Sequence, residues 1–381
     1  MTDATTPTVA PRIAYLDSVR GLAALSVVVY HFIGWRWADT LQFKLASMVF
    51  NGSDAVSLFF VLSGLVLSWK YFQPDESIQI TGAHYKEFVV NRVVRLYLPY
   101  LVAIVVIYYF LAHRHEPAVL VIGQFFTNET HWMEEALLMR GKHDMYGPGW
   151  TLEIELAASL FLPFLVLLLR QSRQLFFMLV AVYVVLGPPI VMNQLFHFML
   201  GMTLTYFFPL IARYDLRTSR YYPLRYGVYV LAFLLFSSRH LTRIFPLSEL
   251  ANYWLGLLRV DLFFFTGIGA FVLLAYIINS PRLQRALENR PLLFLGRISY
   301  SLYLVHWFLV DLVMKKLAVW LPGSPHHRLT LVAAFAGTLA VALLTATVFN
   351  VLVERPAIRL AKHLSARFAA PAPGPAALAQ A

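Results

Sequence analysis

Long apolar segments alternate with short polar ones along most of the chain. Segments such as LVAIVVIYYFLA and LVAAFAGTLAVALLTATVFNVLV are apolar on every side, which is typical of membrane helices and not of the alternating strands of a barrel. The pattern therefore predicts an all-α, polytopic transmembrane helical bundle of about ten spans. We place these spans at residues 18–35, 54–71, 96–112, 150–169, 175–192, 194–211, 226–240, 260–278, 298–314 and 329–353.

Composition agrees with a lipid bilayer as the main partner, because 59% of the residues are hydrophobic and only 13% are charged. The net charge of +11 does not indicate a nucleic-acid partner, since the basic residues are spread over many short loops. With ten spans, 20 of the 31 basic residues fall on the side of both termini and 11 on the other. The positive-inside rule therefore predicts that both termini are cytoplasmic. The absence of cysteine excludes disulfides, thiolate metal ligands and a cysteine nucleophile.

The spans define one transmembrane domain, residues 18–364, between two polar ends. We expect residues 1–17 to form a cytoplasmic N-terminal segment, because this stretch lacks the basic start of a secretory signal. Residues 365–381 are rich in alanine and proline, a composition that builds no core, so a disordered tail is expected there.

The first span carries two ionisable residues, Arg20 and His31. Eleven residues separate them, about three helical turns, so the two side chains lie on nearly the same face about 16 Å apart. Ionisable groups inside a membrane are usually functional and need a polar partner or a polar cavity. A core histidine bonded to a neighbouring carbonyl is the alternative interpretation for His31.

Further ionisable residues lie at the third and fourth spans. Arg92 and Arg95 stand one turn apart at the start of the third span, where two guanidiniums can clamp a phosphate or simply anchor the span at the inner face. Glu155 lies about one and a half turns into the fourth span, at a depth similar to that of His31, so the two could share a cavity.

Three other features allow functional and structural interpretations. Gly64 in FFVLSG permits a close helix contact or a backbone bend. His306, near the middle of the ninth span, is either catalytic or a core residue satisfied by the hydroxyl of Tyr300 or Tyr303. The neighbouring His326 and His327 diverge and have no evident third ligand, so we expect no metal site there.

Taken together, these segments resemble the acyltransferase 3 family of bacterial membrane O-acyltransferases over nearly the whole chain. The resemblance rests on landmarks that occur in the order of the family, ending with VERP at 353–356. The others are LDSVRGLAALSVVVYH with Arg20 and His31, FFVLSG at 59–64, the Arg92 and Arg95 pair before Pro99, WTLEIE at 150–155 and GRISYSLYLVHW at 296–307.

The resemblance implies a bacterial inner-membrane enzyme that moves an acyl group, expected to be acetyl, from acyl-CoA to a hydroxyl of a glycan or another acceptor. Acyl-CoA would be a co-substrate, with no permanently bound cofactor and no metal. We accordingly expect catalytic roles for His31 and Glu155, and CoA binding by Arg20, Arg92 and Arg95.

Two versions of the mechanism fit the residues. His31 acts as a general base toward the acceptor hydroxyl or first accepts the acyl group itself, and Glu155 orients its ring. The competing hypothesis is a proton-coupled transporter or flippase in which the same buried groups form a path across the membrane. Dependence on acyl-CoA separates these two functions.

Overall fold

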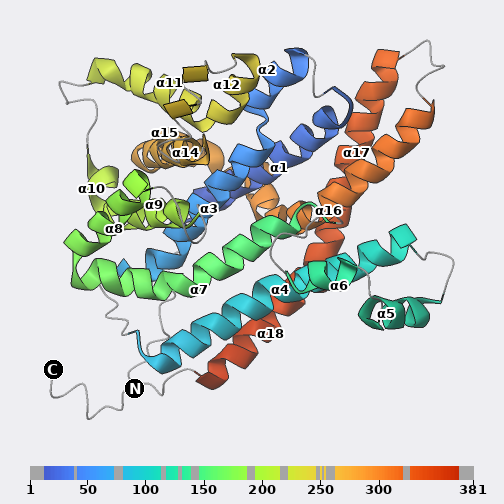
Figure 1. The fold of residues 1–381 in the computed structure, drawn as a ribbon, viewed down its shortest axis with the longest axis horizontal. Coiled ribbons are helices and arrows are strands. Elements are labelled where there is room, and N and C mark those ends of the chain that lie inside the picture. Colours follow the sequence, from blue (N-terminus) through green and yellow to red (C-terminus); the bar gives the residue numbers. More distant parts are fainter. Residues whose placement is uncertain are drawn as a thin grey trace. The chain divides into compact units, whose positions relative to one another are not determined.

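The computed structural model describes residues 13–37, 41–72, 80–112, 117–127, 131–138, 146–186, 194–214, 222–245, 249–250, 253–254, 262–320 and 327–368. The regular structure of these residues is helical throughout, which confirms the predicted all-α fold (Figure 1). The α-helices are α1 (Ala14–Trp37), α2 (Leu41–Val49), α3 (Gly52–Trp69), α4 (Gly82–Ala112), α5 (Ala118–Thr127), α6 (His131–Ala136), α7 (Gly149–Gln171), α8 (Arg173–Leu186), α9 (Leu195–Tyr206), α10 (Phe208–Arg213), α11 (Arg225–Phe236), α12 (Ser238–Ile244), α14 (Leu262–Asn279), α15 (Pro281–Leu287), α16 (Arg290–Trp320), α17 (His327–Phe349) and α18 (Arg355–Ser365). Short 3-10 segments are η1 (Lys70–Phe72), η2 (Tyr222–Leu224) and η5 (Ala366–Phe368), and η4 (Asn350–Glu354) is a π-helix.

Within the described residues, 7 helical segments are long and apolar enough to cross a membrane. Shorter apolar helices lie where three further spans are predicted, at Arg173–Val184, Leu195–Tyr206 and Arg225–Phe236. The helix α9 has 12 residues, which at about 1.5 Å per residue is shorter than a hydrocarbon core of about 30 Å. The membrane bundle is thus confirmed, whereas the count of ten spans stays a prediction.

The chain forms two compact units. Unit 1 comprises residues 1–76 and 164–347, and unit 2 comprises residues 77–163 and 348–381. The chain passes between the units after residue 76, inside α7 at Pro163, and near the end of α17. Residues 18–364, predicted as one transmembrane domain, are thus divided between the two units. Residues 1–12 and 369–381 of the predicted terminal segments lie outside the described residues.

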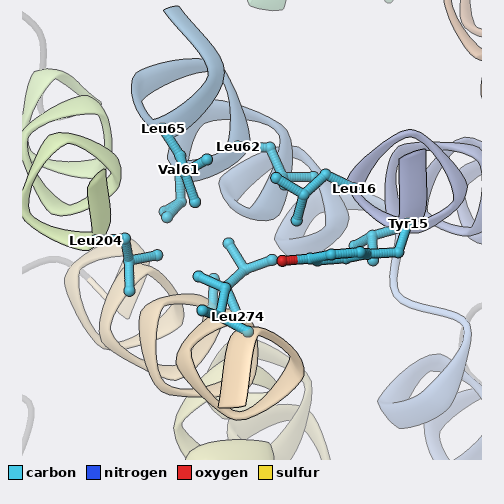
Figure 2. Close-up of a cluster of buried hydrophobic side chains, with 10 residues drawn as sticks. Tyr15, Leu16, Val61, Leu62, Leu65, Leu204 and Leu274 are labelled. Carbon is cyan, nitrogen blue, oxygen red and sulfur yellow. The ribbon is translucent and has the colours of Figure 1, made fainter. Parts of the chain in front are cut away.

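The core of unit 1 forms where α1, α3, α9 and α14 pack together. Figure 2 shows the buried side chains that these helices contribute, among them Leu16 of α1, Leu62 of α3, Leu204 of α9 and Leu274 of α14. The helices α3 and α9 approach closely because a Cβ on Gly64 would clash with the backbone of Phe198 in α9. Of the two alternatives for FFVLSG, the structure therefore has the close helix contact.

In unit 2, α18 packs on α4 through small residues. Ala357, Ala361 and Ser365 are buried on α18, and the Asn91 side chain of α4 donates a hydrogen bond to the Ser365 hydroxyl at 3.3 Å. The helix α4 begins at Gly82, well before the predicted start of the third span at 96. The stretch between them is also apolar at helical spacing, so it continues the helix on the surface of α18.

The last predicted span does not end at residue 353, because η4 continues it directly into α18. This widened turn comes just before Pro356, which has no N–H with which to continue a regular α-helix. The Asn350 side chain donates to Glu354 at 2.8 Å and accepts from Arg355 at 3.0 Å. These bonds hold the widened turn and give Glu354 a structural role.

Candidate functional site

His31 projects from α1 into a group of aromatic rings in unit 1. Its ring is half-buried and lies edge-on to Trp307 of α16, with ring centres 4.8 Å apart. The ring of His306 is 5.4 Å away and tilted by 30°, and that of Tyr30 is 5.4 Å away. Among the described residues, no hydrogen-bond partner is found for the nitrogens of His31. Within this part of the chain, the ring is therefore held by packing against other rings.

Two glycines bring His31 and His306 together. A Cβ on Gly21 of α1 would lie 2.5 Å from the backbone nitrogen of Gly296 in α16, so the two backbones touch at this point. His31 and His306 each follow one of these glycines by ten residues. The two helices therefore run in the same direction, and small residues at their crossing fix the histidines at one level.

His306 is 1% exposed and lies deep in unit 1. Its Nδ1 is 2.7 Å from the backbone carbonyl of Tyr303, one turn earlier in α16. The partner is thus a carbonyl and not the tyrosine hydroxyl that the sequence suggests. The Nε2 atom is buried and has no hydrogen-bond partner among the described residues.

Arg20 lies near the start of α1, eleven residues before His31. Its guanidinium is half-buried and is 3.7 Å from the Asp17 carboxylate, one turn earlier. This acidic neighbour, which the sequence analysis did not consider, orients the guanidinium at the rim of the helix pair formed by α1 and α16.

In unit 2, Arg92 and Glu155 form an ion pair. The Arg92 Nη2 donates to the Glu155 Oε1 at 2.6 Å, and the two side chains are 10% and 24% exposed. The pair joins α4 to α7. The Tyr85 hydroxyl of α4 also donates a hydrogen bond to the backbone carbonyl of Leu160 in α7, at 3.5 Å. A buried arginine beside a carboxylate gains a strong charge-assisted hydrogen bond.

Arg95, one turn beyond Arg92 on α4, is exposed. The two arginines therefore differ in their surroundings, because one is buried against Glu155 and the other faces outward. The sequence alone treats them as an equivalent pair, since it shows only their spacing.

A polar cluster that the sequence analysis missed lies near His31 in unit 1. The carboxylate of Asp54 is fully buried, accepts a hydrogen bond from Asn51 Nδ2 at 2.8 Å and lies 3.4 Å from His240 Nε2. His240 Nε2 is also 3.0 Å from the Asn51 side-chain oxygen, and an Arg239 nitrogen is 3.9 Å from Asp54. These residues come from the start of α3 and from α12, far apart in the chain, so only the fold joins them.

Tyr30 links the polar cluster to His31. Its ring centre is 5.4 Å from those of both His240 and His31. Gly52 lies directly against the same ring, where a Cβ would clash with it. The sequence does contain a signal for this cluster, namely an asparagine and an aspartate at the start of an apolar span. A helix N-terminus needs such caps, and a carboxylate inside a membrane needs a partner.

The predicted site residues thus fall into two groups. Arg20 and His31 belong to unit 1, whereas Arg92, Arg95 and Glu155 belong to unit 2. A contact between His31 and Glu155 would join the two units, and it stays a prediction. Among the described residues, no three histidine, aspartate or glutamate side chains lie close enough to hold a metal ion, and His326 falls outside these residues.

Comparison with known families gives one match. Residues 13–347 match the acyltransferase 3 model, which is described as an acyltransferase domain. Comparisons with curated proteins and with solved structures gave no match. The matched region contains Arg20, His31, Arg92, Glu155 and His306.

Proposed function

The chain belongs to the acyltransferase 3 family and is a membrane acyltransferase, and from this premise we propose that it is an O-acyltransferase of the cytoplasmic membrane. The donor is acyl-CoA, with acetyl as the acyl group, and the acceptor is a hydroxyl of a glycan. The observation that carries the proposal is His31, a half-buried imidazole among packed membrane helices whose nitrogens have no hydrogen-bond partner among the described residues.

An imidazole in this setting suits acyl transfer to an alcohol. The reaction needs a group that takes the hydroxyl proton as the oxygen attacks the thioester carbon, and a neutral imidazole does this near neutral pH. The aromatic rings of Tyr30 and Trp307 pack against His31 and cover part of its ring, which favours transfer to the acceptor over hydrolysis.

In this proposal, arginine side chains bind the phosphate groups of CoA. Planar guanidiniums match phosphate oxygens in charge and geometry. Arg95 is exposed on α4, where its guanidinium can meet a phosphate, while Glu155 orients the buried Arg92 beside it. Arg20 lies near the start of α1, eleven residues before His31, and adds positive charge for the phosphates of CoA.

The test is turnover of acetyl-CoA by the purified protein in nanodiscs, with octyl glucoside as acceptor and release of the CoA thiol as readout. We expect His31→Ala to lower kcat about 100-fold or more, as removal of a general base does. Arg95→Ala should weaken acetyl-CoA binding about tenfold, the loss of one charge-assisted hydrogen bond. Matched controls are His363→Ala and Arg282→Ala, which change an exposed histidine and an exposed arginine outside the proposed site.

Two results would contradict the proposal. Wild-type protein that is folded but neither binds nor cleaves acetyl-CoA would favour the transporter or flippase hypothesis. Turnover that survives His31→Ala at the wild-type rate would keep the reaction class but remove the residue assignment.

A further inference from the structure

We propose that His306 is a positioning residue for His31 and that its Nε2 accepts a hydrogen bond from the His31 ring when His31 carries the acceptor proton. The inference deepens the proposed acyl transfer and rests on it. It comes from a buried nitrogen that no described residue satisfies, opposite the one imidazole that the reaction needs.

The hydrogen bond to Tyr303 fixes the tautomer of His306. A carbonyl oxygen can only accept, so Nδ1, which lies 2.7 Å from it, carries the hydrogen. In the neutral ring Nε2 is then a bare acceptor. Leaving such an acceptor buried without a partner costs about 1–3 kcal/mol, so it is expected to gain a donor at some stage of the reaction.

The distance between the two rings suits this contact. The ring centres of His31 and His306 are 5.4 Å apart, and the planes differ by only 30°. A ring nitrogen lies about 1.1 Å from the ring centre, so two nitrogens that face each other would be about 3.2 Å apart, at hydrogen-bond distance. Rotation of His31 about its soft χ2 torsion changes which ring atom faces His306, so a nitrogen of His31 can reach this position.

With this contact, the two nitrogens of the His31 ring have different roles. One His31 nitrogen takes the proton of the acceptor hydroxyl while the new C–O bond forms and the thioester C–S bond breaks. The other nitrogen donates its hydrogen to His306 Nε2, and the His306 Nδ1 hydrogen stays on the Tyr303 carbonyl. The leaving thiolate then takes the proton from His31, so CoA departs as the thiol and both histidines return to their starting state. His306 has the role of the residue that orients the histidine in a catalytic triad.

The test compares His306→Phe, which keeps a ring and removes the acceptor, with His306→Gln, whose amide can both donate to Tyr303 and accept from His31. We expect His306→Phe to lower kcat about 10- to 100-fold, since it removes a hydrogen bond to a charged group in the transition state. KM for acetyl-CoA and for octyl glucoside should change less than about threefold, because the bond forms only when His31 is charged. His306→Gln should recover most of the lost rate.

The matched control is His197→Gln, which changes another fully buried histidine of unit 1 that bonds a backbone carbonyl, that of Phe263. We expect it to keep the wild-type rate. Nitrogen NMR of histidine-labelled wild-type protein gives a readout independent of folding of the variants, and we expect an unprotonated Nε2 on His306.

Several outcomes would overturn the inference. A wild-type rate in His306→Phe, an equal loss in His306→Gln, or a hydrogen on Nε2 in the spectrum would each remove the role of His306 while leaving the acyl transfer intact. A folded wild-type protein without any release of CoA would instead overturn the proposed function, and this inference with it.

Discussion

The ion pair between Arg92 and Glu155 allows a quantitative test of the structure within unit 2. The two charges are 2.6 Å apart, and the side chains are only 10% and 24% exposed. At an effective dielectric constant of about 20, the gross attraction is roughly 6 kcal/mol. Removal of both groups from water offsets much of this gain, and hydrogen bonds to charged groups typically contribute about 1.5–3 kcal/mol net. We therefore expect a coupling free energy of about 2 kcal/mol.

The measurement is a double-mutant cycle with Arg92→Gln, Glu155→Gln and the double variant. Each protein is unfolded by increasing SDS in mild detergent micelles, and helix loss is followed by circular dichroism. Each single variant should lose about 3 kcal/mol or more of unfolding free energy, because it leaves a largely buried charge without its partner. The double variant should lose clearly less than the sum of the two.

A matched control is the pair of Lys315 and Asp311 on α16. Its charges are 2.7 Å apart, almost the same distance, but the side chains are 64% and 28% exposed. The same cycle there should give a coupling of only about 0.3–0.5 kcal/mol, because exposed pairs on a helix are screened by water.

Additivity would refute the reasoning. Suppose that the losses of unfolding free energy in Arg92→Gln and Glu155→Gln sum to within about 0.5 kcal/mol of the loss in the double variant. The two groups then do not interact in the folded protein. Glu155 would then be available for the role beside His31 that the sequence predicts. A large coupling in the exposed control pair would show that burial does not set the magnitude.

Further predictions concern the surroundings of His31. Gly21→Ala should lower turnover more than about tenfold, because the new methyl group separates α1 from α16 and moves the two histidines apart. The control is Gly337→Ala, whose added Cβ meets nothing within 4 Å and should leave turnover unchanged. Asp54→Asn should lower the unfolding free energy by about 3 kcal/mol, measured by SDS titration, because it removes a fully buried carboxylate that contacts His240. An equal loss in the exposed-pair variant Asp311→Asn would contradict that explanation.

The sequence predicts the helical membrane fold and most helix positions correctly, because apolar length is a local property. It is less accurate at helix ends. The helix α4 starts at Gly82 and not at 96, and α17 continues through the π-helix η4 to Ser365. These ends depend on how α4 and α18 cover each other, which no local pattern records.

Some close contacts also have a local signal. The glycine of FFVLSG indicates a close approach between helices, and the structure has it at Gly64. The spacing does not indicate which helix is the partner. That partner is α9, more than a hundred residues further along the chain. The absence of a side chain at Gly201 in α9 also permits the close approach.

By itself, the sequence determined that this protein crosses a membrane, that it resembles an acyltransferase family, and that Arg20 and His31 share one helix face. Each of these follows from composition, from short motifs or from helical periodicity. Only the tertiary structure decided the partners of the buried polar groups: Glu155 for Arg92, and Asp54 with Asn51 for His240. The physical reason is that a buried charge or imidazole is satisfied through space, by whichever polar group the packing of distant helices brings within a few ångströms.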